Sequence, residues 1–165
     1  MSIGQQLLAE FEQELHATRR VLERIPEEHY GWRAHPTSMS LGQLALHVAA
    51  VPGGVLQMIQ ADSMEAPNFQ QAEATSRSEV MAALDDTAAA VRRTLSTADD
   101  AWLMTPWTLV REGRELLRLP KVAMIRMVGM NHIYHHRGQL AMCLRMLGVP
   151  VPSVYGASRD ENPFA

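Results

Sequence analysis

Hydrophobic residues recur along the first part of the chain at steps of three and four positions, the spacing of one helix face. Residues 3–24 carry such a stripe. Ser40 and Gln43 have the spacing of a helix capping box, and a second stripe follows them to about residue 61. A third helix is expected to open at Ser78. The pattern therefore predicts three amphipathic helices in the first hundred residues or so.

The second part of the chain contains one more long stripe between irregular segments. Pro120 suits the first turn of a fourth helix, which the pattern extends to Leu147. Residues 62–77 are expected to form a linker, and the tail after the fourth helix is too rich in proline, glycine and serine to be helical. Residues 99–119 fit either a short helix or two short strands, and the pattern leaves this choice open.

Four long amphipathic helices predict an all-α fold, an up-down four-helix bundle formed as a single domain over residues 1–165. Hydrophobic residues make up 47% of the chain and charged residues 20%, the proportions of an ordinary globular protein. The net charge of −3 argues against nucleic-acid binding, which needs concentrated positive charge. We expect no membrane-spanning stretch and, with one cysteine, no intrachain disulfide; the expected location is therefore cytoplasmic.

The segment NHIYHHRGQ, residues 131–139, places three histidines in the predicted fourth helix. At about 100° per residue, His136 falls about 40° from His132 on the helical wheel, and His135 lies near the edge of the same face. Apolar residues of the helix share this face: Ile125, Val128, Leu140, Cys143, Met146 and Leu147. The arginines are expected on the opposite, solvent face: Arg126, Arg137 and Arg145. We therefore expect the core to bury His132 and His136, where imidazoles need polar partners.

One histidine of the predicted second helix faces the same way. His47 shares a wheel face with Leu44, Val51 and Val55, so it too is expected to point inward. One inward histidine from one helix and a His-x-x-x-His pair from another can converge between the helices. Three imidazoles suit a divalent metal ion and leave coordination positions open. Core histidines held only by hydrogen bonds are the alternative, and the residues alone leave both interpretations open.

Two stretches, HPTSMSLGQLALHVA (35–49) and NHIYHHRGQLAMCLRMLGVPVPSVYG (131–156), closely resemble the DinB-like (DinB/YfiT) superfamily of four-helix-bundle metalloproteins. The resemblance implies a metal held by one histidine of the second helix and a His-x-x-x-His pair of the fourth. Those positions match His47, His132 and His136 of this sequence. We expect one divalent ion, zinc or nickel, and a homodimer. His135 is then a candidate for supporting a ligand or lining the entrance to the site.

Members of this superfamily with known activity resemble metal-dependent transferases that use low-molecular-weight thiols such as bacillithiol, mycothiol or glutathione. The glutamate of the zinc-protease motif His-Glu-x-x-His is missing between His132 and His136, and no Glu-x-x-His motif of a di-iron bundle occurs. A metal with three neutral ligands can deprotonate a bound thiol without a protein base. The favoured expectation is thiol transfer on a small-molecule substrate, with no catalytic residue assigned. Metal-dependent hydrolysis and a non-enzymatic, dimeric metal-binding bundle are the alternatives.

Overall fold

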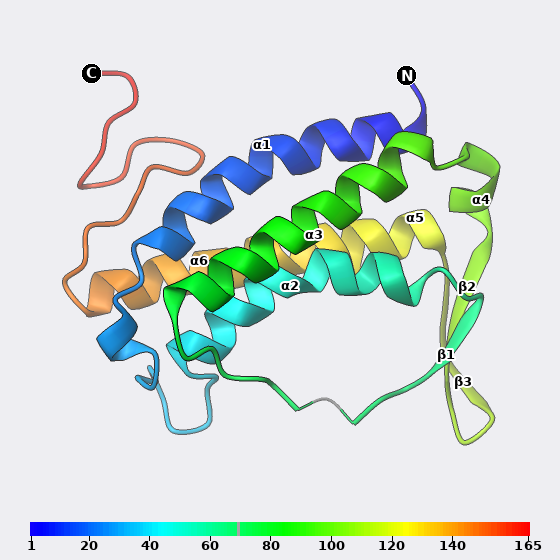
Figure 1. Cartoon of the computed structure of the whole chain (residues 1–165), viewed down its shortest axis with the longest axis horizontal. Coiled ribbons are helices and arrows are strands. Elements are labelled where there is room, and N and C mark those ends of the chain that lie inside the picture. The colour runs from blue at the N-terminus through cyan, green and yellow to red at the C-terminus, as the bar shows by residue number, and fades with distance from the viewer. Residues whose placement is uncertain (69) are drawn as a thin grey trace.

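The structure is a computed structural model that describes residues 1–68 and 70–165. Four long helical segments dominate it (Figure 1). The first three are α1 (Ile3–Glu23), α2 (Leu41–Met58) and α3 (Arg77–Thr97). The fourth is a continuous composite of α5 (Lys121–Met124), the π-helical segment η2 (Ile125–Asn131) and α6 (His132–Met146). Two short elements join them, the 3-10 helix η1 (Glu27–His29) and the α-helix α4 (Asp100–Met104).

Side-chain caps set the starts of α1, α2 and α3. Ser40 accepts a hydrogen bond from the backbone N–H of Gln43, whose side chain accepts one from the Ser40 backbone in return, so the predicted capping box is confirmed. The third helix starts one residue earlier than predicted, at Arg77, because Ser76 rather than Ser78 is its cap. The helix positions therefore follow local signals closely.

The four long segments enclose one apolar core. Helix α2 packs against α3 on one side and against η2 and α6 on the other, while α1 packs against α3 and α6. Helices α1, α2 and α3 contribute the apolar stripes that the sequence predicted. All four segments place buried residues in the core, which include Leu7, Val21, Val48, Leu95 and Leu140. The mainly helical fold is confirmed. The four long segments are also the four helices that the sequence predicted for the bundle.

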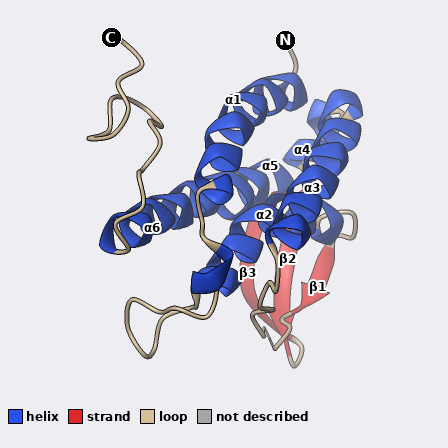
Figure 2. Ribbon diagram, turned by 60° about the vertical axis from the view of Figure 1, so that its left-hand side comes forward, coloured by secondary structure: helices blue, strands red, loops and turns tan. Residues whose placement is uncertain are grey.

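A three-stranded sheet lies at one end of the helices, and the all-α prediction did not include it (Figure 2). Strand β1 (Ser63–Glu65) pairs in parallel with β2 (Pro106–Arg111), which forms an antiparallel hairpin with β3 (Arg114–Pro120). For residues 99–119 the sequence left two alternatives, a short helix or two strands. The structure contains both, as α4 and the hairpin of β2 and β3. The predicted linker contributes β1, which is too short for an alternating pattern and forms only by pairing with a distant part of the chain.

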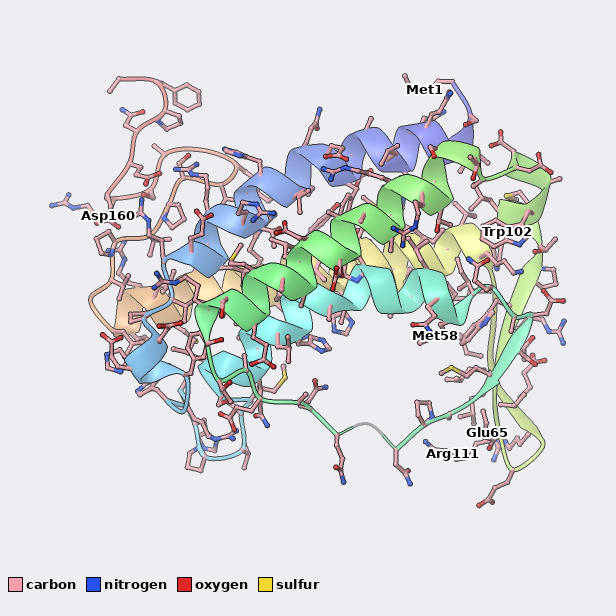
Figure 3. All side chains as sticks on the ribbon, in the orientation of Figure 1. Met1, Met58, Glu65, Trp102, Arg111 and Asp160 are labelled. Atoms are coloured by element: carbon pink, nitrogen blue, oxygen red, sulfur yellow. The ribbon has the colours of Figure 1, made fainter. Side chains whose placement is uncertain are left out.

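Buried polar contacts hold this sheet against the helices. The indole N–H of Trp107, a fully buried residue, donates to the carbonyl of Met58 at the end of α2, at 3.3 Å. Lys121, which is 2% exposed, donates from Nζ to Asp62 at 3.0 Å and lies 4.8 Å from the centroid of Trp102. Met58 and Trp102 mark this end of the molecule in Figure 3. The sheet is therefore fixed to both α2 and the start of the composite helix.

Helix α2 is long and apolar enough, by length and composition, to cross a membrane, contrary to our expectation from the sequence. Half of its residues are buried inside the structure. Core helices of soluble proteins meet the same criterion, so this is weak evidence for a membrane span. The absence of membrane contact and the cytoplasmic location stay predictions.

The composite helix departs from the uninterrupted α-helix that the periodicity predicted. The backbone N–H of His132 bonds to the carbonyl of Met127, five residues earlier, which is the π-helical pattern. A π turn holds more residues than an α turn, so it rotates the preceding residues relative to those that follow. Gly129 and Met130 are buried in η2, whereas Val128, expected on the core face, is half-buried.

The core-facing side of α6 also differs from the predicted one. Its buried residues are Ile133, Arg137, Leu140 and Leu144, while Met146, expected on the core side, is exposed. The prediction that Arg137 faces solvent is wrong, whereas Arg126 and Arg145 are exposed as expected. The guanidinium of Arg137 is buried because α1 and the tail supply its partners, which the pattern of one helix cannot reveal.

The tail after α6 is not helical within the described residues, as predicted, yet charged side chains attach it to the helices. Glu161 pairs with Arg20 and Arg24 of α1, and Asp160 pairs with Arg145 of α6. The Asp160 carboxylate also accepts the backbone N–H of Val151, at 2.8 Å. Asp160 lies at the end of the molecule opposite the sheet (Figure 3). The tail is therefore part of the folded unit.

Candidate metal centre

Three histidines bring their Nε2 atoms to one point between α2 and α6. The Nε2 atom of His132 lies 2.9 Å from Nε2 of His47 and 2.8 Å from Nε2 of His136. One potential ligand atom from each residue lies within 4.8 Å of the others. We call these residues the histidine cluster. The structure thus brings together the three residues that the sequence analysis singled out from two separate helices.

The histidine cluster lies at the margin of the core. All three side chains are half-buried. His132 and His136 are therefore less buried than the sequence led us to expect. The reason is the rotation of α6, which turns Ile133 and Arg137 toward the core and leaves the histidines beside that face. One side of the cluster is consequently accessible from solvent.

Local backbone features place the two histidine-bearing helices close together. His132 is the first residue of α6 and directly follows the π-helical segment, and His136 lies one turn later on the same face. In α2, Pro52 follows His47 by little more than one turn and has no N–H to continue the helical hydrogen-bond ladder. Gly129 of η2 lies against Val55 of α2, where a Cβ would stand 3.8 Å from the nearest atom, an ordinary packing contact.

The surroundings of the cluster favour neutral imidazoles. The pKa of His47 is lowered to about 4, mainly by burial and further by the neighbouring His136 and His132, while a contact with Gln71 acts in the opposite direction. Burial is also the largest cause that lowers the pKa of His132. A neutral imidazole carries the lone pair that metal binding requires, so these two rings are ready to act as ligands at neutral pH.

The cluster fits a divalent metal ion. Two nitrogen atoms bound to one ion at about 2.1 Å are separated by about 3.0 to 3.4 Å in common geometries. The observed separations of 2.8 and 2.9 Å need only a slight outward movement of the rings. In the described part of the chain, the cluster contains three imidazoles and no carboxylate or thiolate. Such a set of three neutral donors resembles an open metal site more than a closed structural one.

A side chain that the sequence analysis did not single out contacts the cluster. Nδ1 of His136 lies 2.7 Å from Oε1 of Gln139, and the amide nitrogen of Gln139 lies 3.0 Å from Nε2 of His135. His135 itself is exposed, and it contacts the cluster both through Gln139 and through its ring, which lies 5.0 Å from the ring of His136. The spacing of Gln139, three and four residues after these histidines, is a signal in the sequence that could have revealed the contact.

Three further residues with polar or reactive side chains have other surroundings. Cys143 is half-buried, and burial raises the pKa of its thiol, as expected for a packing residue. The hydroxyl of Tyr155 contacts Arg137 and Glu14 on another face of α6. His35 bonds to Thr37 within the loop before α2, which agrees with a role in fixing that loop.

Comparison with known proteins identifies the family. The model of the DinB family matches residues 1–162. The chain belongs to the DinB family. The resemblance drawn from the two histidine-bearing stretches is therefore confirmed for nearly the whole chain. No curated protein matches this DinB-family chain.

Solved structures agree with this assignment. A DinB-like protein of Bacillus cereus is 26% identical, with a TM-score of 0.69 over 90% of this DinB-family chain and 95% of that one. A DinB-like protein of Bacillus subtilis is 23% identical, with a TM-score of 0.68 over 90% of this chain and 96% of that one. The second likeness concerns the fold alone. Together they show that this DinB-family protein has a DinB-like fold.

Proposed function

We propose that this protein binds one divalent ion, zinc or nickel, and acts as a metal-dependent thiol S-transferase on a small molecule. The ligands would be the Nε2 atoms of His47, His132 and His136. The observation that carries the proposal is the convergence of three imidazoles, without a carboxylate among them, on the half-exposed side of the core. Three protein ligands leave room for an exogenous ligand.

The ligand set suits thiol chemistry. A bound divalent ion would supply the Lewis acidity that lowers the pKa of a thiol and holds it as the thiolate. The chain contributes three neutral donors, which compensate none of the positive charge, and an exposed side through which the thiol proton leaves to solvent. The sulfur would then form a bond to an electrophilic carbon of the acceptor, whose leaving group departs with its bonding electron pair. This sequence of steps requires no acidic or basic side chain at the cluster.

Metal binding is tested by elemental analysis and calorimetry on protein purified without an affinity tag. The His132→Ala variant should lose stoichiometric binding of zinc or nickel, because two remaining imidazoles cannot hold the ion at a defined site. His16→Ala removes an exposed histidine of α1 and serves as the matched control, which should retain wild-type metal content. Equal metal content in His132→Ala and wild type would contradict the proposal.

The reaction type is tested with the cobalt-substituted protein. Addition of bacillithiol, mycothiol or glutathione should produce a sulfur-to-cobalt charge-transfer band and release roughly one proton near neutral pH. If no thiol changes the spectrum and ester or amide hydrolysis depends on the metal, a hydrolase replaces the transferase. If neither occurs, a non-enzymatic metal-binding protein is favoured. The homodimer stays a prediction that light scattering would test.

A further inference from the structure

Gln139 joins a histidine of the cluster to a histidine outside it. Its carbonyl oxygen lies 2.7 Å from Nδ1 of His136, and its amide nitrogen lies 3.0 Å from Nε2 of His135. All three residues belong to α6 and lie within one turn of one another. Both ends of one carboxamide are therefore engaged, and its orientation is coupled to the tautomers of the two histidines.

The orientation of this amide bears directly on metal binding. A neutral imidazole carries a proton on one ring nitrogen and a lone pair on the other. Since Nε2 of His136 faces the cluster, it can be a ligand only when the proton is on Nδ1. The Gln139 oxygen can only accept, so it stabilises the form with Nδ1–H. A reversed amide would present its N–H₂ group to Nδ1 and favour a proton on Nε2, where a metal would bind.

The tautomer of His135 decides which end of the amide faces His136. In its neutral form with the proton on Nδ1, His135 offers a lone pair at Nε2, which can accept only from the N–H₂ end of Gln139. The oxygen end is then left for His136. His135 also contacts the cluster directly, because its ring lies 5.0 Å from the ring of His136 in an edge-on arrangement.

We propose that Gln139 is a positioning residue that holds His136 in the ligand-competent tautomer, and that His135 sets the orientation of Gln139. The effect on metal affinity rests on the proposed function, whereas the effect on the tautomer does not. Partners of metal-bound histidines are commonly carboxylates or backbone carbonyls. Here the partner is a side-chain amide whose direction depends on a further histidine. Because both supporting residues are exposed, their substitution should leave the core intact.

Two substitutions separate hydrogen bonding from packing. Gln139→Leu removes the acceptor at similar size, and Gln139→Glu keeps an acceptor facing His136. Gln13→Leu, at an exposed position of α1, is the matched control. Zinc affinity is measured by competition with a chromogenic chelator, and the His136 tautomer by ¹⁵N NMR of the metal-free protein. Gln139→Leu should weaken zinc binding by about 10- to 100-fold and increase the Nε2–H form, whereas Gln139→Glu and Gln13→Leu should resemble wild type.

The role of His135 is tested by a double substitution. His135→Ala alone should weaken zinc binding, because the amide of Gln139 can then reverse. In the Gln139→Glu background the same change should have little effect, since both ends of a carboxylate accept hydrogen bonds. Equal losses in both backgrounds would show that His135 acts independently of Gln139 and would overturn this half of the proposal.

The outcomes distinguish this inference from the proposed function. Wild-type affinity and tautomer in Gln139→Leu would overturn the role of Gln139, and so would a Gln139→Glu variant as weak as Gln139→Leu. A wild-type protein that binds no metal would overturn the proposed function. The tautomer comparison in the metal-free protein would then still decide whether Gln139 orients His136.

Discussion

Replacing Glu14 of α1 by alanine should destabilise the protein far more than a typical loss of an ion pair. The Glu14 carboxylate lies 2.6 Å from Nη2 of Arg137, whose side chain is 3% exposed. The guanidinium also donates to the Thr18 hydroxyl at 3.0 Å and contacts the Tyr155 hydroxyl. These partners are neutral, so the Glu14→Ala variant would leave a buried positive charge without a counter-charge.

The size of this effect follows from burial. Two opposite charges about 4 Å apart attract each other by about 4 kcal/mol at an effective dielectric constant of about 20. Removal of one partner of a buried ion pair typically costs about 3 to 5 kcal/mol. Since the side chain of Glu14 is 15% exposed and water can reach its place, we expect the lower end, about 3 kcal/mol. For a domain of this size the melting temperature should fall by roughly 10 °C.

The assay is urea unfolding of the metal-free protein, followed by circular dichroism. The matched control is Glu12→Ala on the same helix, which breaks the bidentate pair with Arg92, where the side chains are 38% and 53% exposed. That change should lower the free energy of unfolding by less than about 1 kcal/mol. Glu14→Leu combined with Arg137→Met should recover most of the stability lost in Glu14→Ala, because no charge then remains buried. If Glu14→Ala and Glu12→Ala cost the same, the reasoning from burial is wrong.

Three further predictions concern other parts of the molecule. Asp62→Ala should lower the free energy of unfolding more than Lys121→Met, because within residues 1–68 and 70–165 it leaves the buried ammonium only the Trp102 ring as a partner, whereas Asp62 itself is solvent-exposed; urea unfolding of both variants measures the difference. The pKa of Asp160 is lowered, chiefly by its hydrogen bond to Arg145, so its attachment of the tail should persist above pH of about 4 and be lost as the pH falls through that lowered pKa. The protection factor of the Val151 amide, which compares its exchange rate with that of an unstructured chain at the same pH, should then fall, and an unchanged protection factor down to pH 2 would refute this. Chelation of metal should leave the helical circular dichroism intact, because the apolar core is formed by the chain alone, and saturating metal should raise stability by about 3 kcal/mol at 100 times its dissociation constant.

Most of the candidate site could be predicted from the sequence because its members are related by helix geometry. His132 and His136 are one turn apart, so any helix through them places both on one face. The contact of Gln139 with His135 and His136 follows the same rule. Predicting that His47 converges with this pair required the resemblance to a known family. Periodicity shows that the histidines of both helices face inward, but it does not show that they lie at the same level along the helix axes.

The sequence by itself determined where the long helices lie, since capping, periodicity and helix-ending residues act within a few positions of one another. Only the tertiary structure decided the features that depend on distant partners. Strand β1 forms because residues 63–65 pair with residues 108–110. Arg137 is buried where Glu14 and Thr18 accept its hydrogen bonds. The same contacts, together with the π-helical segment, set the rotation of α6. That rotation leaves the histidine cluster half-exposed at the edge of the core, because Ile133, Leu140 and Leu144 occupy the core-facing positions of the helix.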